Sequence, residues 1–265
     1  MLDFSRLNEV EVESYRPNER FGPISENIIR AFYQDILAPG DVAVDVGVHY
    51  GVHLFSMREC VGDTGLVYGI EANVERYAAV LKRLSNQGRT NVQLLHLAAA
   101  HEEGFRDFFV NRTHSGYSGL VANKKLPTDT IEQVTVFATA LSAVIPRKLR
   151  PKFMKIDIEG AEFPALLGAK ETIVNSRMLI IFEGKLTMSA EKFGYQTERV
   201  AEFIHDIGYC VFDLFGNPIG LAAWTGGFGW NFVAGPDNEA ARKTMAQALT
   251  QAWVNVLAEE SKESR

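Results

Sequence analysis

The sequence predicts an α/β fold with a mostly parallel sheet, and three observations lead to this prediction. Short apolar strands alternate with segments of helical periodicity along most of the chain, which is typical of proteins built from βαβ units. A glycine-containing turn, residues 45–51, directly follows the first of these strands. Acidic residues end several strands, and open α/β sheets bind ligands beyond the carboxyl ends of their strands. We therefore expect one large sheet with a ligand site at that edge.

Length and composition are those of a globular protein with a large core. The chain has 265 residues, of which 46% are hydrophobic and 23% are charged. Its net charge of −6 lacks the basic character of a general nucleic-acid binder, so we expect no nucleic-acid partner. The apolar runs are far shorter than the roughly 20 residues that span a bilayer, and the two cysteines lie far apart in the sequence. We expect a cytoplasmic protein that does not bind membranes.

The individual elements follow from periodicity and from capping residues. Residues 1–24 are polar and irregular, and a first helix is expected over 25–37 with Ser25 as its N-cap. Residues 1–39 are thus interpreted as an N-terminal helical cap, 40–236 as the main domain, and 237–265 as a C-terminal helix packed on the same domain. Strands are expected at 42–46, 66–70, 92–97, 153–156, 178–182, 209–212 and 231–234, with helices at 52–59, 74–84, 161–174, 200–207 and from 238 onward.

An insertion at about 103–150 interrupts this alternation. Residues 105–110 and 133–137 have the composition of strands, and a polar loop connects them. A loop of this length inside a compact fold is usually functional or mobile. The sequence therefore predicts seven sheet strands plus an inserted strand pair.

The turn Asp45-Val-Gly-Val-His-Tyr-Gly51 is the strongest local indication of a ligand. Gly47 permits a tight turn and the approach of a ligand to the backbone, and the N–H groups that open the next helix favour an anion. The dinucleotide fingerprint Gly-x-Gly-x-x-Gly would need a glycine where His49 stands, so a pyrophosphate fits poorly. A cofactor with a single carboxylate, such as S-adenosylmethionine (SAM), fits better. Glu71 ends the second strand and can accept hydrogen bonds from both hydroxyls of a ribose.

A second group of acids lies in Lys155-Ile-Asp-Ile-Glu-Gly-Ala-Glu162. If the strand continues, its alternation sends Asp157 and Glu159 to the same side, and Glu183 ends the neighbouring strand. Clustered acids of this kind can hold a cation, orient a hydroxyl or share a proton. Asp157 is interpreted as functional, whereas Glu162 is interpreted as a first-turn acid that the helix dipole favours.

Together the two stretches resemble the FkbM family of SAM-dependent methyltransferases. That family carries an Asp-Val-Gly-Ala-Asn-x-Gly-like turn and a Lys-Ile-Asp-x-Glu-Gly-Ala-Glu signature, and the resemblance covers roughly residues 40–183. Two departures stand out: His49 replaces the usual Asn, and residues 137–141 lack the acid of a Thr-Leu-Asp stretch. The resemblance implies a Rossmann-like class I methyltransferase fold, with a seven-stranded, mostly parallel sheet whose last strand is antiparallel, and methyl transfer to oxygen.

The resemblance also implies roles for individual residues. Asp157 would lie near the methyl group, and Asp157, Glu159 and Glu183 are the candidate general bases, with His49, His53 and His114 as alternatives. His114 and Ser118 in the inserted loop are candidate substrate contacts. The cofactor-binding residues would be Asp45, Gly47, His49, Tyr50 and Gly51 at the methionine part, Glu71 at the ribose, and Ala72, Asn73 and Ala98, Ala99 and Ala100 beside the adenine.

The predicted function is SAM-dependent O-methyl transfer to a hydroxyl of a small-molecule or glycan-like acceptor. A non-catalytic SAM-binding module is one alternative, because the acid near Ala140 is missing, and an NAD(P)-dependent dehydrogenase is the weaker one. Strand-end acids also suit a divalent metal such as Mg²⁺, which would lower the pKa of the hydroxyl. The aromatic and glycine-rich segment 224–230 suits a sugar ring or plain packing, and the last helix suits the core or a homodimer surface.

Overall fold

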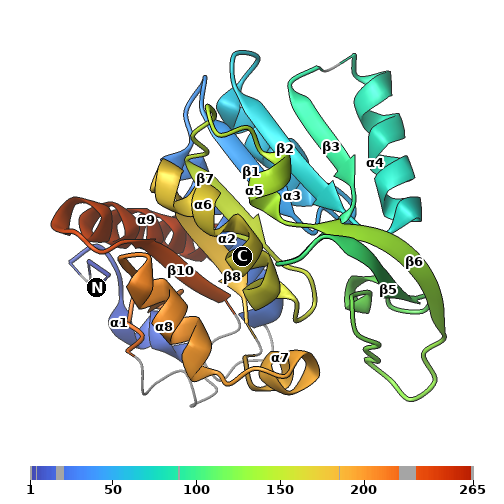
Figure 1. The fold of residues 1–265 in the computed structure, drawn as a ribbon. Coiled ribbons are helices and arrows are strands. Elements are labelled where there is room, and N and C mark those ends of the chain that lie inside the picture. The colour runs from blue at the N-terminus through green and yellow to red at the C-terminus, as the bar shows by residue number, and fades with distance from the viewer. Residues whose placement is uncertain are drawn as a thin grey trace.

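The computed structural model describes residues 2–3, 5–15, 21–88, 90–184, 186–220 and 231–263, so the segment 224–230 lies outside the described residues. The chain forms a twisted sheet with helices on both faces (Figure 1). Its strands are β1 (Val42–Val46), β2 (Leu66–Glu71), β3 (Val92–His96), β7 (Phe153–Ile156), β8 (Leu179–Glu183), β9 (Tyr209–Asp213) and β10 (Asn231–Pro236).

The order of these seven strands is β3-β2-β1-β7-β8-β10-β9. The pairs between β3 and β8 are parallel, whereas β10 runs antiparallel to both of its neighbours. This arrangement confirms the predicted Rossmann-like sheet with an antiparallel last strand. Because β1, β2, β7 and β8 are parallel neighbours, the turns that follow them all meet at one edge of the sheet.

Alternating side chains of the strands feed two apolar layers, one on each face. On the first face, Ala43 and Phe153 pack against four helices, and on the second face Val44 and Met154 pack against three others. The first layer of helices comprises α2 (Phe21–Ile36), α3 (Val52–Val61), α4 (Val74–Asn86) and α9 (Glu239–Glu263). The second layer comprises α5 (Leu141–Val144), α6 (Glu162–Ser176) and α8 (Glu198–Asp206).

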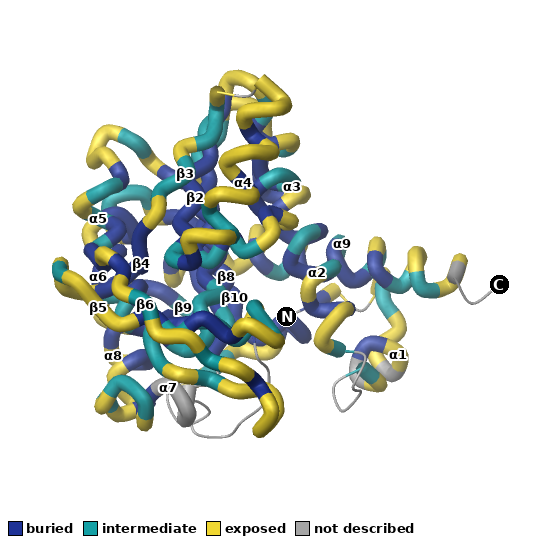
Figure 2. The backbone as a smooth tube through the Cα atoms, turned by 90° about the vertical axis from the view of Figure 1, so that its right-hand side faces the viewer, coloured by how far each residue is buried: buried dark blue, intermediate teal, exposed yellow. Residues whose placement is uncertain are grey.

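The N-terminal region differs from its prediction in two ways. The first predicted helix begins earlier, at Phe21, so Ser25 lies inside α2, where its hydroxyl donates to the carbonyl of Gly22 instead of capping the helix. A short helix, α1 (Glu9–Ser14), occupies part of the stretch predicted to be irregular, because Asn8 accepts a hydrogen bond from Glu11 N–H at its start. Helix α2 lies alongside α9, which extends past the sheet together with α1 and α2 (Figure 2).

The insertion forms a small second sheet beside the main one. The predicted pair is confirmed as an antiparallel hairpin of β5 (Gly104–Asn111) and β6 (Ile131–Thr139), which projects from the body in Figure 1. A two-residue strand, β4 (Ala98–Ala99), pairs with β6 and was not predicted, because two residues carry no periodicity. One face of the hairpin buries Phe108 and Val136, and the connecting loop contains the short 3₁₀ turn η1 (Ser115–Tyr117).

One further helix completes the described chain. Helix α7 (Leu186–Phe193) follows β8 and was not predicted. Among the described residues, no helix combines the length and the apolar character that crossing a bilayer requires.

Candidate functional site

A pocket opens where the turns after β1, β2 and β7 meet the inserted hairpin. It encloses about 780 Å³, its open mouth included. Most of the residues that the sequence singled out lie in its wall. The predicted residues that line it are Gly47, His49, Glu71, Ala72, Asn73, Ala98, Ala99, Ser118, Asp157 and Glu159.

Other predicted residues lie beside the pocket rather than in its wall. Gly51 is the N-cap of α3 with a φ of 81°, and Tyr50 is half exposed, with the guanidinium of Arg76 stacked 4.2 Å from its ring centroid. The imidazole Nδ1 of His114 lies 2.8 Å from a carboxylate oxygen of Asp129, away from the pocket wall.

Several lining residues were missed by the sequence reasoning. Arg76 lies three residues after Asn73, one turn into α4, so helical spacing could have identified it. Ser115 and Leu120 come from the inserted loop, where no periodicity indicates which side chains turn inward. Phe108 lies on the buried face of the hairpin, which the alternation of β5 could have suggested.

Gly47 joins the two halves of the site. Its φ is +89°, and a Cβ there would lie 1.9 Å from the carbonyl oxygen of Asp157. The turn after β1 therefore rests directly on the turn after β7, and no residue with a side chain fits between them. The sequence reasoning ascribed this glycine to the approach of a ligand, whereas the close approach of the chain to itself already requires it.

His49 is held in a left-handed backbone conformation with a φ of 51°. Its N–H donates to Glu71 over 2.7 Å, and its ring Nε2 lies 2.9 Å from the hydroxyl oxygen of Ser115. Burial, together with the positive charge of Arg76, lowers the pKa of His49, so the imidazole is neutral at neutral pH. Asn and His both tolerate a left-handed backbone better than most residues, which explains why His can stand where the FkbM pattern has Asn.

Glu71 connects the turns after β1 and β2. One carboxylate oxygen accepts the N–H of His49 and the other accepts the N–H of Asn73, each over 2.7 Å. Asn73 in turn caps α4 by accepting the N–H groups of its first turn. Burial raises the pKa of Glu71 to about 7. A carboxylate has about four lone-pair sites, so Glu71 can still accept hydroxyl donors after these two bonds.

Asp45 is a buried carboxylate without a hydrogen-bond donor. It is 1% exposed, and neither of its oxygens has a hydrogen-bond partner among the described residues. Burial raises its pKa, although the cross-strand neighbour Lys155 acts in the opposite direction. The ammonium of Lys155 donates to Asp157 instead, over 2.9 Å. A buried unsatisfied acceptor in a folded protein calls for an explanation, and a missing cationic ligand is one.

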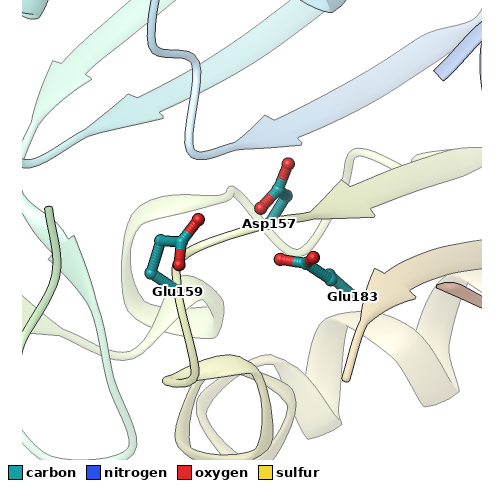
Figure 3. A group of neighbouring side chains, drawn as sticks. All are labelled: Asp157, Glu159 and Glu183. Carbon is teal, nitrogen blue, oxygen red and sulfur yellow. The ribbon is translucent and has the colours of Figure 1, made fainter. Parts of the chain in front are cut away.

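Three carboxylates converge beside the pocket, as Figure 3 shows. Asp157 follows β7, Glu183 ends β8, and one oxygen each of these two and of Glu159 all lie within 4.8 Å of one another. The predicted cluster therefore exists, but strand alternation does not form it. The strand ends at Ile156, and Glu159 reaches the cluster through a left-handed turn with a φ of 58°.

The ammonium of Lys155 stabilises the negative charge of Asp157. Burial opposes its ionisation, but the charge and hydrogen bond of Lys155, with a further hydrogen bond to Glu183, outweigh burial and lower the pKa of Asp157. Three carboxylates offer the oxygen ligands that Mg²⁺ takes. The ammonium already bound at Asp157 disfavours a second cation next to it, so the cluster also suits proton sharing.

The inserted loop is tied to this site at several points. Asn123 donates its amide N–H to Glu159 over 3.2 Å, and Arg112 pairs with Glu75 of α4 over 2.6 Å. Inside the loop, the buried Asp129 accepts hydrogen bonds from Asn111 and from two backbone N–H groups. The loop is thus internally braced and closes one side of the pocket.

Comparison with known proteins gives one family match. The profile of the methyltransferase FkbM domain matches residues 45–211, whereas no curated protein matches the chain significantly. Among solved structures, FkbM methyltransferase from Methylobacillus flagellatus KT is similar, with 14% identity over 76% of this chain and 47% of that chain, and a TM-score of 0.49. The present chain thus spans about half the length of that protein.

Two further solved structures are similar at the same low identity. A SAM-dependent methyltransferase from Aquifex aeolicus has 14% identity, covers 86% of this chain and 97% of its own, and has a TM-score of 0.41. A SAM-dependent O-methyltransferase from Thermotoga maritima has 11% identity, covers 80% and 64% respectively, and has a TM-score of 0.44.

Proposed function

The chain belongs to the FkbM family of SAM-dependent methyltransferases, and we propose that it methylates a hydroxyl oxygen of a small-molecule or glycan-like acceptor. The family membership supports SAM as the cofactor and methyl transfer as the reaction. The choice of oxygen as the acceptor atom rests on one observation, the three carboxylates that converge beside the cofactor pocket.

The acceptors in the pocket wall and behind it fit SAM. Asp45, a buried carboxylate without a donor, would hold the ammonium of the methionine part. Glu71 would accept the ribose hydroxyls with the lone pairs that its backbone contacts leave. The apolar wall formed by Ala98 and Phe108 would contact the adenine. His49 stands where the dinucleotide fingerprint needs a glycine, which disfavours the dehydrogenase alternative.

The chemistry of an alcohol acceptor explains the need for acids. When bound, SAM supplies a methyl group on a positively charged sulfur, and the carbon–sulfur bonding pair stays with the sulfur as the methyl leaves. A neutral hydroxyl is a weak nucleophile, and a positioned base that takes its proton accelerates such a step by about 10²–10⁴-fold. The cluster of Asp157, Glu159 and Glu183 provides carboxylates for this purpose at the pocket.

The polar inner surface of the inserted loop supports a hydroxylated acceptor. Ser118 lines the pocket, and Asn123 contacts Glu159 from the same loop. His114 lies at the start of η1 and remains a candidate contact for a larger, glycan-like acceptor. The net charge of −6 supports an uncharged acceptor over a nucleic acid.

The proposal is tested first by calorimetric titration with SAM, S-adenosylhomocysteine and NADH. We expect saturable binding of the first two and none of NADH. Release of S-adenosylhomocysteine is then measured with the methyl glycosides of glucose, rhamnose and fucose as probe acceptors. Asp157→Asn should abolish release but leave the folded state intact, whereas Glu202→Gln on α8, whose side chain is largely exposed, should change nothing.

Two outcomes contradict the proposal in different ways. Binding of NADH instead of SAM would overturn the methyltransferase function. Tight SAM binding without release for any hydroxyl probe, and with no difference between wild type and Asp157→Asn, would favour the non-catalytic SAM-binding module.

A further inference from the structure

The turn that carries the acids, residues 157–160, holds Glu159 in a backbone conformation that a residue with a side chain does not favour. Glu159 has a φ of 58° and Gly160 a φ of 104°. A left-handed conformation is unfavourable for a residue with a Cβ, because the Cβ comes too close to the following carbonyl oxygen. Such conformations persist only where the surroundings enforce them, and they concentrate at functional sites. Something in the structure must therefore hold this turn.

Glu162 is the side chain that does so. Its Oε1 accepts the N–H of Ile158 over 3.1 Å and the N–H of Gly160 over 3.0 Å, so one oxygen bridges the amides on both sides of Glu159. Glu162 is only 3% exposed, although it lies in the first turn of α6. An acid that served the helix dipole alone would gain nothing from this burial, which raises its pKa to about 7.

The same turn is fixed from two other directions. From the cofactor side, Gly47 packs against the carbonyl of Asp157. From the insertion, Gly119 packs against Glu159: a Cβ added to Gly119 would lie 3.4 Å from the Cβ of Glu159. Asn123, also from the insertion, donates its amide N–H to the Glu159 carboxylate. Contacts from three separate segments thus define where the side chain of Glu159 points.

Of the clustered acids, Glu159 is the best placed to accept a proton. Asp157 bonds the buried ammonium of Lys155 and also bonds Glu183, which keeps it ionised and makes it a weak base. Glu159, in contrast, receives the neutral amide of Asn123 and lines the pocket.

We propose that Glu162 is a positioning residue of the acceptor site: by bridging the amides on both sides of Glu159, it keeps the left-handed turn that aims the Glu159 carboxylate at the acceptor hydroxyl. This inference rests on the proposed function. In the reaction, a lone pair of the hydroxyl oxygen forms the bond to the methyl carbon, the carbon–sulfur pair remains on sulfur, and the hydroxyl proton passes to Glu159.

The test compares Glu162→Gln with Glu162→Ala. Gln keeps an oxygen that can accept both amides, whereas Ala removes the bridge. Hydrogen exchange at the Ile158 and Gly160 amides, which needs no acceptor, should stay slow in Glu162→Gln and become fast in Glu162→Ala. With the methyl glycoside that the wild type uses best, Glu162→Ala and Glu159→Gln should each lower kcat at least about 100-fold. Glu162→Gln should keep kcat within about threefold of the wild-type value. The Kd for SAM should change less than about threefold in every variant.

Glu198 provides a matched control. It is an exposed acid in the first turn of α8, so Glu198→Ala removes a helix-dipole contact without removing a bridge. It should leave both exchange and kcat unchanged. Should Glu162→Ala fail to fold, Glu162→Asp replaces it, because the shorter side chain keeps the charge but withdraws the oxygen from the turn.

The outcomes separate this inference from the function on which it rests. Unchanged exchange and kcat in Glu162→Ala would overturn the inference, as would a failure of Glu162→Gln to rescue or a loss of SAM affinity in parallel with kcat. A wild-type protein that transfers no methyl group to any hydroxyl probe would overturn the proposed function, and the proton-acceptor role of Glu159 with it. The exchange measurement would still decide whether Glu162 holds the turn.

Discussion

Replacing Asp45 by Asn should stabilise the cofactor-free protein and remove most of its affinity for SAM. Asp45 is fully buried, and neither oxygen receives a hydrogen bond from any described residue. Leaving a buried acceptor unsatisfied costs roughly 1–3 kcal/mol, and a charge raises the cost. Lys155 offsets part of this through space, yet its own hydrogen bond goes to Asp157 and would survive the substitution. Asn keeps the shape and removes the charge.

The size of the expected stability change follows from the cost of burying the Asp45 charge and from its attraction to Lys155. With Lys155 taking up part of the cost, we expect Asp45→Asn to raise the free energy of unfolding by about 1–2 kcal/mol at pH 8. For a protein of this size, each kcal/mol corresponds to roughly 2–4 °C in Tm. The sign depends on pH. Because burial raises the folded-state pKa of Asp45 above its unfolded value, the wild type loses stability as pH rises through that raised pKa, and the variant does not. The advantage of Asn should therefore appear at pH 8 and shrink toward pH 5.

Urea unfolding at both pH values, with and without SAM, measures these effects. At 100 times its Kd, SAM should stabilise the wild type by about 2.7 kcal/mol. It should stabilise Asp45→Asn far less, because the amide cannot pair with the ammonium of the methionine part. A variant that is less stable than wild type at pH 8, or one that binds SAM as tightly, would refute the reasoning.

Asp129 provides the matched control, because it is a buried Asp whose carboxylate, unlike that of Asp45, accepts several hydrogen bonds. Burial tends to raise its pKa, but hydrogen bonds from Asn111, His114 and two backbone amides outweigh burial and lower the pKa to about 2. Its contribution to stability is therefore present above its unfolded pKa and is lost as pH falls toward 2. Asp129→Asn should destabilise the protein at pH 8, where Asp45→Asn stabilises it.

Three further predictions concern the walls of the pocket. Gly168→Ala should lower the urea midpoint by the equivalent of about 1–3 kcal/mol and weaken SAM binding, although Ala in a helix normally stabilises, because a Cβ there would lie 2.0 Å from the carbonyl oxygen of Ala100. His49→Asn should keep the calorimetric Kd for SAM within about threefold, whereas His49→Val should raise it strongly, because a β-branched residue does not tolerate a φ of 51°. EDTA should leave the release of S-adenosylhomocysteine unchanged, since the ammonium of Lys155 bound at Asp157 disfavours a second cation there; a rate that falls and returns with Mg²⁺ would assign the cluster to a metal.

The strands of the main sheet could be predicted within one or two residues, because most of them are short apolar runs that are buried along their length, whereas the edge strand β3 is only partly buried. The convergence of Asp157 and Glu183 could be predicted as well, since parallel neighbouring strands end at the same edge. Helix α1 and strand β4 could not, because six and two residues are too few to show a period. Ser118 was predicted, but the other inward side chains of the inserted loop, Ser115 and Leu120, were hidden, because bonds within the loop, such as those of Asp129, decide its path.

Residue types were easier to predict than the reasons for them. A first-turn acid such as Glu162 is compatible with both a surface role and a buried one, and only the position of the preceding turn distinguishes them. Gly47 was predicted to permit a tight turn and the approach of a ligand, and its φ of +89° together with the nearby carbonyl of Asp157 already requires a glycine there, whether or not a ligand binds. Both residues contact the same turn, residues 157–160. Gly47 lies more than 100 positions before this turn in the sequence, whereas Glu162 lies two positions after it. A left-handed glutamate is unfavourable by itself, so its persistence depends on contacts that local spacing cannot reveal, and the geometry of the acid cluster is consequently a property of the assembled fold.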